Sequence, residues 1–311
     1  MSTLHLVDPE LRDILDLLPA RNFTVEELPA VRAAAAQLPL PELPPGLTVD
    51  EVRVPRDAAP DVRVLVTRPT ALPAGAPALV WIHGGGYVVG SADSDQLNAA
   101  QLALGVGMVV VSVDYGLAPE NPHPGPVEDC YAALRWLHGN ADDLGVDRSR
   151  IAIGGGSAGG GLAAALGLLA RDRGEVPVAF QYLVFPMIDD RTVTREANPT
   201  TGEFVWTRAS NAFGWRALLG AEPGSDGVSP YAAAARAEDL TGLPPTFLEV
   251  GSLDLFLDED VEFALRLVRA GVPTELHVYP GAFHGYQMVA TSTVARTSGE
   301  LGVSALRRAL G

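Results

Sequence analysis

One glycine-rich stretch in the middle of the chain constrains the fold more than any other. Residues 149–169 read SRIAIGGGSAGGGLAAALGLL. The apolar run Ile151–Ile153 predicts a short buried strand, and the run Ala163–Leu169 predicts a helix. Between them, residues 155–159 (GGSAG) fit the G-x-S-x-G pattern, in which a strained strand-to-helix turn lifts a serine hydroxyl clear of the sheet. This nucleophile elbow predicts Ser157 as a reactive serine.

Two other interpretations fit the same glycines. Gly154, Gly156 and Gly159 also spell G-x-G-x-x-G, the dinucleotide-binding fingerprint, which needs an acid about 20 residues on, after the next strand. The next predicted strand, Ala179–Phe185, has no acid at its end until Asp189. The other interpretation is a flexible turn without chemistry. The choice depends on whether the rest of the chain supplies partners for the serine.

A serine hydroxyl needs a base to accept its proton, and the base needs a carboxylate to orient it. In an α/β-hydrolase these groups follow the serine in the order acid, then histidine. His277 lies within the alternating strand Glu275–Tyr279, where we interpret it as a side chain of the strand face. His284 lies in a glycine-flanked loop just past that strand, where active-site residues gather in α/β folds. We therefore predict His284 as the base.

The acid is expected after the preceding strand, 245–250. That strand ends in Gly-Ser-Leu-Asp, so Asp254 lies on the loop that follows and is predicted as the acid. Three more acids come next, Asp258, Glu259 and Asp260. We interpret them as acids of a helix's first turn, where they favour the helix dipole.

The reaction also needs donors for the oxyanion of the tetrahedral intermediate. The predicted strand 78–82 runs directly into His83-Gly84-Gly85-Gly86-Tyr87. Successive glycines allow backbone amides to approach a ligand without a Cβ in the way. Together with the amide of Ala158, at the start of the helix, they predict an oxyanion hole of the HGGG type formed by Gly84, Gly85, Gly86 and Ala158.

Alternating strands and helices predict an α/β fold. Two alternating segments, 49–55 and 62–68, predict an antiparallel hairpin at a sheet edge. Apolar β-runs then alternate with helical runs, which is typical of a mainly parallel sheet covered on both faces. The further strands are predicted at 78–82, 108–113, 150–154, 179–184, 245–250 and 275–279, and the helices near 94–104, 126–138, 158–171, 259–270 and 293–309.

Charge and composition narrow the function classes. The net charge is 22 − 38 = −16 and no basic stripe is present, which argues against nucleic-acid binding. No run reaches the ~18 apolar residues that a membrane span needs, and the N-terminal residues lack the pattern of a signal peptide, so we expect a cytoplasmic protein. The single Cys130 excludes an internal disulfide, and the six histidines are scattered without His-x-x-x-His pairing, so no metal is expected.

Together these motifs resemble the hormone-sensitive lipase family of α/β-hydrolases, the bacterial carboxylesterases with an HGGG box. The resemblance runs from about Val80 to Tyr286 and rests on HGGGYVVG at 83–90, YGLAPENPHPGPVEDCYAALRWL at 115–137, GGSAGG at 155–160, GSLDLFLDE at 251–259 and FHGY at 283–286. It implies an α/β-hydrolase fold, with an eight-stranded, mostly parallel sheet flanked by helices and a helical cap. It also implies no cofactor, a triad of Ser157, Asp254 and His284, and an oxyanion hole in which Gly85 and Gly86 are the favoured donors.

Three positions depart from the family pattern. Gly156 fills the variable position of the elbow, which usually reads GDSAGG or GTSAGG. Gly116 stands where the YxLAPE loop usually has arginine, and Leu255 replaces the proline that normally follows the acid. None of them removes a catalytic group, but they leave the subfamily and the substrate range open. Glu128 and Asp129 match the acidic pair after the YxLAPE loop and are interpreted as supports.

The resemblance also implies how the chain divides. Helical patterns around Pro9–Leu18 and Val25–Leu38 predict N-terminal cap helices. The expected parts are 1–47 as N-terminal cap helices, 48–186 and 221–311 as the catalytic domain, and 187–220 as a cap insertion. The insertion is rich in aromatics: we expect Phe213 and Trp215 to anchor a helix, and Phe204 and Trp206, with Tyr87, to wall the substrate pocket.

The function expected is a serine carboxylesterase that hydrolyses short- to medium-chain esters through an acyl-enzyme. The partner expected is a small-molecule ester. A non-catalytic small-molecule receptor on the same fold is the alternative from another class, and an amidase or lactonase is the alternative among hydrolases. The oligomeric state is left open, with a homodimer as one option.

Overall fold

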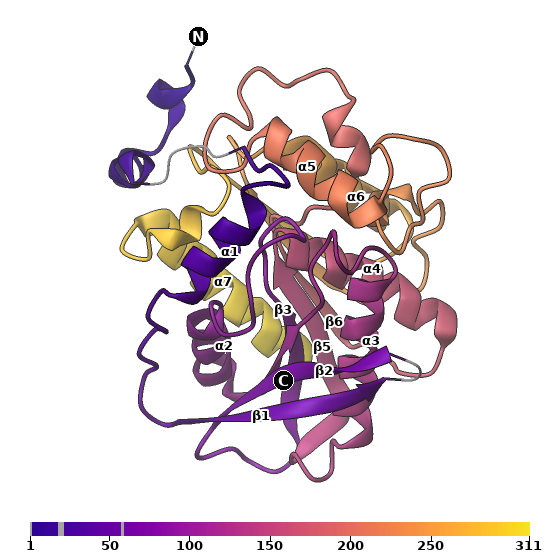
Figure 1. Ribbon diagram of the computed structural model, residues 1–311. Helices are drawn as coiled ribbons and strands as arrows, with labels where there is room; N and C mark the ends of the chain where they lie inside the picture. The colour runs from indigo at the N-terminus through magenta and orange to yellow at the C-terminus, as the bar shows by residue number, and fades with distance from the viewer. Residues whose placement is uncertain (1, 18–21, 57–58) are drawn as a thin grey trace.

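The computed structural model describes residues 2–17, 22–56 and 59–311 (Figure 1). Its centre is one eight-stranded sheet in the order β1-β2-β4-β3-β5-β6-β7-β8. β1 and β2 pair antiparallel, as do β2 and β4, and every other pairing is parallel. The strands are β1 Leu47–Arg56, β2 Ala59–Pro69, β3 Ala76–Ile82, β4 Val109–Asp114, β5 Val146–Gly156, β6 Phe180–Val184, β7 Thr246–Gly251 and β8 Thr274–Tyr279. The predicted α/β-hydrolase sheet is confirmed, including its antiparallel hairpin.

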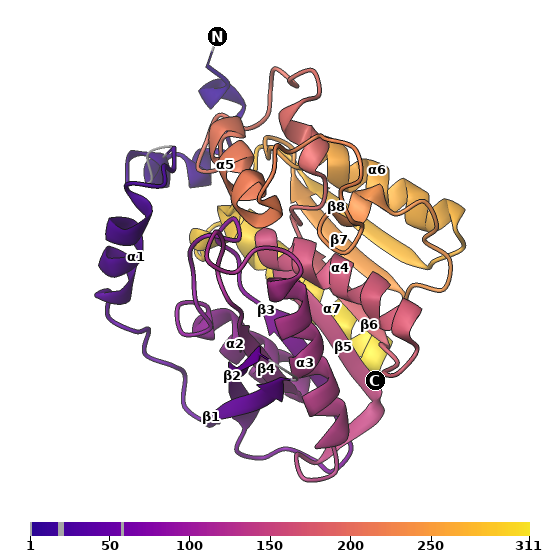
Figure 2. The same ribbon diagram turned by 45° about the vertical axis from the view of Figure 1, so that its right-hand side comes forward.

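Helices cover both faces of the sheet (Figure 2). Along β3, Val80 and Ile82 pack into the core shared with α3 (Gly125–Gly139), α4 (Ala158–Arg173) and α6 (Leu257–Arg269). Leu79 and Trp81 face the other way, into the core shared with α2 (Gln96–Leu102) and α7 (Thr293–Leu310). Because neighbouring strand residues point to opposite faces, a strand buried on both sides is apolar throughout, as β3 is.

The N-terminal segment differs from its prediction. The pattern at Pro9–Leu18 predicts a helix, but the chain forms two 3₁₀ turns, Pro9–Leu11 and Asp13–Asp16, and residue 18 lies outside the described residues. The Asp8 side chain caps the first turn by accepting from the amide of Glu10, which holds the chain in a short turn. The second predicted helix is present as α1, Leu28–Ala36.

The segments that break the strand–helix alternation gather at one end of the molecule. Both views place α5 (Arg208–Leu219) beyond the carboxyl end of β3, and α1 to one side of that end (Figures 1 and 2). The carboxyl ends of parallel strands form the edge where α/β proteins bind ligands. Among the helices of the described residues, none is long and apolar enough to cross a membrane.

Candidate active site

Ser157 occupies the tight turn between β5 and α4. Its backbone angles, φ 58° and ψ −122°, lie in a region that non-glycine residues rarely adopt. Two backbone hydrogen bonds hold the turn: the Ser157 amide donates to the Val184 carbonyl at 2.9 Å, and the Met187 amide donates to the Ser157 carbonyl at 2.9 Å. The strain is therefore supported by the segment that follows β6.

The glycines of the elbow are required by close packing. A Cβ on Gly155 would lie 2.5 Å from backbone atoms of both Gly159 and Ile82, and a Cβ on Gly159 would lie 2.0 Å from the Ile82 carbonyl oxygen. Both distances are too short for any side chain. The first turn of α4 thus packs on the end of β3, which is the geometry that the G-x-S-x-G pattern predicts.

The predicted acid and base reach the serine from the loops that follow β7 and β8. The Ser157 Oγ and His284 Nε2 atoms are 2.8 Å apart, and His284 Nδ1 and Asp254 Oδ2 are 2.9 Å apart. Asp254 is fully buried, and its other oxygen accepts from the Phe256 amide at 3.0 Å. The His284 ring is enclosed by the edge contacts of Phe185 and Phe256, with ring centroids 4.9 and 5.0 Å away. This arrangement holds the imidazole with one nitrogen on the hydroxyl and one on the carboxylate.

The glycine loop after β3 borders the same site. A Cβ on Gly84 would lie 3.3 Å from the Ser157 Cβ, so this backbone passes beside the nucleophile. Gly85 and Gly86 have φ of +114° and +59°, which an L side chain rarely adopts. Ala158 opens α4 and is buried. Amides from both segments therefore border the same space, and their role as oxyanion donors stays a prediction.

The three residues predicted to wall the pocket occupy different places. Tyr87 is fully buried and its hydroxyl donates to the Met187 carbonyl at 2.7 Å. Phe204 packs on Phe283, with ring centroids 5.9 Å apart. The Trp206 ring lies 6.3 Å from the His284 ring. Two of the three thus contact the loop of the base, and the pocket assignment stays a prediction.

The three acids at the start of α6 lie in its first turn, as predicted, but the sequence did not indicate that two of them are buried. Only Asp258 is exposed as an acid of the first turn normally is, whereas Glu259 and Asp260 are buried. Glu259 accepts from the amides of Ile188 and Asp189 at 2.8 and 3.1 Å, and from the Thr192 hydroxyl. Burial raises the pKa of Glu259 well above its usual range. Glu259 thus links α6 to the segment that follows β6, a contact that the helix pattern cannot reveal.

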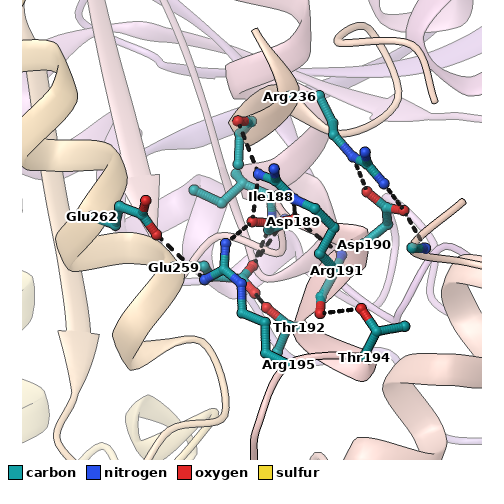
Figure 3. Close-up of polar contacts among 12 residues, drawn as sticks. Ile188, Asp189, Asp190, Arg191, Thr192, Thr194, Arg195, Arg236, Glu259 and Glu262 are labelled. Atoms are coloured by element: carbon teal, nitrogen blue, oxygen red, sulfur yellow. Dashed lines mark hydrogen bonds and ion pairs between the residues drawn. The ribbon is translucent and has the colours of Figure 1, made fainter. Parts of the chain in front are cut away.

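Beside Glu259 lies an ion-pair cluster that the sequence analysis missed (Figure 3). The buried Asp189 carboxylate accepts from Arg191 at 2.8 and 3.0 Å and from Arg195. The neighbouring Asp190 pairs with Arg236 at 2.8 and 2.9 Å. Burial alone would raise the pKa of Asp189, but hydrogen bonds from Arg191 bring it below its usual value. The only sequence signal was the spacing of acids and arginines in DDRTVTR.

The structure shows the surroundings of two of the three departures from the family motifs, Gly116 and Gly156. A Cβ on Gly116 would lie 2.1 Å from Nδ2 of the Asn121 side chain, so a larger residue here requires that side chain to move. Asp129 instead accepts from the Gly116 amide at 2.9 Å and from Arg56 of β1, which fits its predicted supporting role. Gly156 has open space on its Cβ side, with only the Phe185 ring within 4 Å, at 3.8 Å.

Comparison with known proteins agrees with this geometry. A family model described as alpha/beta hydrolase fold matches residues 79–288. The chain belongs to this family. Membership confirms the predicted fold and the resemblance to hormone-sensitive-lipase-type enzymes.

Several named relatives are similar to this protein over nearly its whole length. Carboxylesterase NlhH of Mycobacterium tuberculosis is 36% identical over 308 residues, covering 98% of this chain and 96% of that protein. Esterase LipI of the same organism is 35% identical over 283 residues, covering 90% and 88%. The structure titled Bacterial Heroin Esterase has a TM-score of 0.91 and 42% identity, covering 100% of both chains. These similarities support a carboxylic ester hydrolase of the serine type.

Proposed function

We propose that this esterase hydrolyses esters through Ser157, His284 and Asp254. The Ser157 hydroxyl attacks the ester carbonyl while His284 Nε2 takes its proton, and Asp254 keeps the other ring nitrogen in the useful tautomer. His284 then returns the proton to the departing alcohol, which leaves an acyl-enzyme. Water deprotonated by His284 hydrolyses it. The observation that carries the proposal is the hydrogen-bonded chain from Ser157 to Asp254, with steps of 2.8 and 2.9 Å.

The charge that develops on the carbonyl oxygen is assigned to backbone amides. Gly84, Gly85, Gly86 and Ala158 supply the candidate donors, with Gly85 and Gly86 favoured in the glycine loop. Backbone donors of this kind need no reorganisation when charge develops, because the loop already holds them in place. The positive φ angles of Gly85 and Gly86 support this assignment.

The proposed substrates are short- to medium-chain esters of small molecules. Residues 1–47 and 187–220 form the cap in this proposal, and 48–186 and 221–311 form the catalytic domain. The buried Trp206 beside the His284 ring supports a covered pocket of finite depth. Such a pocket gains about 0.8 kcal/mol per buried CH₂ until it is full. We therefore expect kcat/KM to rise over short acyl chains and to collapse for long ones.

Covalent labelling tests the serine. An organophosphonate probe should attach stoichiometrically to the peptide containing Ser157, as measured by mass spectrometry, because only an activated serine attacks it quickly. Folded protein without an adduct would favour a non-catalytic receptor instead. A panel of matched esters, amides and lactones would separate the esterase from an amidase or lactonase.

Matched substitutions test the acid. Asp254→Asn should lower kcat by about 10⁴-fold, as the same change does in serine proteases, because the asparagine holds the histidine in the wrong tautomer. Asp258→Asn is the control, because Asp258 is an exposed acid on the first turn of α6. If the control variant loses more activity than Asp254→Asn, the assignment of the acid is wrong.

A homodimer and a cytoplasmic location complete the proposal. β8 is the last strand of the sheet order, so among the described residues no strand pairs with its outer side. Val278 on β8 and Val268 on α6 are 42% and 56% exposed, which supports pairing with a second copy. Light scattering of the protein as it elutes from a size-exclusion column measures the mass of the particle and so tests the homodimer. Fractionation of the native cells tests the location.

A further inference from the structure

A cavity lies on the face of the sheet covered by α2 and α7. It has a volume of about 720 Å³ and is lined by both helices and by the ends of β3 and β6. Figure 1 shows α2 and α7 on the same side of the sheet. Ser157 and the glycine loop do not line it, whereas Phe185 and Gly285 do. A cavity of this size, lined by both apolar and polar side chains, is large enough to hold a small molecule.

One carboxylate in this cavity has no counter-ion. The Asp95 carboxylate accepts from the Asn98 side chain, through Nδ2, at 2.6 Å and from the Trp81 indole, which uses two of about four acceptor positions of a carboxylate. Among the described residues no basic side chain forms an ion pair with it, although the buried Asp129 and Asp189 each pair with arginine. Burial raises the pKa of Asp95 to about 6, so the group is ionised above that pH. An unpaired carboxylate facing a cavity is a ready partner for a cation.

Apolar side chains line the same cavity as Asp95. Leu97 and Met288 stand at the cavity with 42% and 51% of their surface exposed, and Leu102 and Val303 lie deeper. Large exposed side chains of this kind are the usual mark of a contact surface when they gather. The cavity therefore offers apolar contact beside a single unpaired acid.

The other charged groups at the cavity do not cancel this acid. Glu300 lines the cavity and is exposed, which adds a second negative charge. Arg296 also lines it, but its guanidinium is held by the Thr291 carbonyl and the Thr293 hydroxyl. The formal charge facing the cavity is thus two acids against one arginine, which favours a cation over an anion.

We propose that the α2–α7 cavity binds an organic ammonium ion, with its charge beside Asp95 and its apolar body between Leu97 and Val303. The site is distinct from the serine, but it borders the base. Phe185 lines the cavity and its ring edge packs on the His284 ring at 4.9 Å. Gly285, the residue after the base, lines it too. A ligand bound here therefore contacts the residues that enclose the catalytic imidazole.

A pair of probes of equal shape tests this proposal. Benzyldimethylammonium and the neutral isobutylbenzene have the same heavy-atom skeleton and differ in charge and in one N–H donor. Calorimetric titration of the full chain at pH 7.5 should show the cation binding at least about tenfold more tightly than the neutral probe. Equal affinities for the two probes would overturn the proposal.

Three variants assign the binding to this cavity. Asp95→Asn should bring the two affinities to within about twofold, and it retains an acceptor for the Trp81 indole. Asp143→Asn, which changes an exposed acid on the loop before β5, should leave the preference unchanged. Gly299→Leu should abolish binding of both probes, because Gly299 lines the cavity with open space at its Cβ, and leucine also favours the helix. Binding that survives Gly299→Leu, or a preference that survives Asp95→Asn, would place the cation elsewhere.

Discussion

The indole of Trp206 lies directly against the backbone of Gly86: a Cβ built on Gly86 would fall 2.1 Å from Cη2 of the indole. Asn211 holds the indole by accepting from its Nε1 at 3.2 Å. The helix α5 approaches the same loop: a Cβ on Gly214 of α5 would lie 2.6 Å from the Gly86 carbonyl oxygen. Gly86 is therefore pressed between Trp206 and α5, so residues 187–220 help to position the candidate oxyanion loop as well as to cover it.

Removing the indole should change substrate preference more than rate. Trp206→Ala should move the chain-length optimum of kcat/KM toward longer or bulkier esters, because it opens the space between Gly86 and His284. Turnover of a short ester should stay within about tenfold, since the triad is untouched. Phe213→Ala is the control, because Phe213 is a partly buried ring of α5 outside this contact. An unchanged chain-length profile, with normal circular dichroism, would show that Trp206 does not line the pocket.

A single methyl group on α5 should disturb the oxyanion loop. Gly214→Ala puts its Cβ 2.6 Å from the Gly86 carbonyl oxygen, so the helix or the loop must move. We expect kcat to fall by about 10- to 100-fold, the size of effect that a small misplacement near the reacting atoms produces. Gly139→Ala makes the same change at a helical glycine with open space around it, and its kcat should stay normal. Equal kcat values for the two variants would contradict the coupling.

The ion-pair cluster around Asp189 should matter for stability. Asp189→Asn removes a buried charge that accepts from Arg191 and Arg195, and the free energy of unfolding should fall by about 2 kcal/mol or more. Arg216→Gln breaks the exposed pair with Glu222 and should cost much less, because solvent screens that pair. Urea unfolding of both variants measures the difference. Similar losses would mean that the cluster does not stabilise the segment after β6.

Glu249 should make stability depend on pH. It is fully buried, and it accepts from Tyr279, Ser298 and Gln287. Burial raises its pKa from 4.5 to about 7. A group whose pKa is raised in the folded state stabilises the fold at low pH, and its contribution is lost as the pH rises through the folded-state value. Glu249 should therefore lower the free energy of unfolding progressively from pH 4.5 to above pH 7.

The variant Glu249→Gln isolates this contribution. Its side chain mimics the protonated acid, so the decline between pH 4.5 and 7 should become shallower and the variant should be more stable than the parent above pH 7. The exposed Glu196→Gln should leave the profile unchanged. Chemical unfolding at several pH values provides the comparison, and parallel profiles for the parent and Glu249→Gln would disprove the role of Glu249.

Local pattern was enough to predict the sheet and the three residues now hydrogen-bonded in series. Ser157, Asp254 and His284 each follow a predicted strand, and parallel strands bring their carboxyl ends to one edge of a sheet. The elbow glycines are equally local, because Gly155 and Gly159 are required wherever this turn packs on the strand beside it. The pattern of apolar and polar residues along each segment, together with the order of the motifs along the chain, therefore determines the fold class and the candidate triad.

Only the tertiary structure decided which polar residues are buried and which segments meet. Glu259 and Asp260 have the sequence pattern of acids in a helix's first turn, yet both are buried, and the partners of Glu259 lie on the distant segment after β6. Trp206 reaches Gly86, and Phe185 reaches His284, across separations of about a hundred residues or more. No periodicity encodes such contacts, because they depend on how whole elements pack. The unpaired Asp95 is also apparent only once the side chains around its cavity are known.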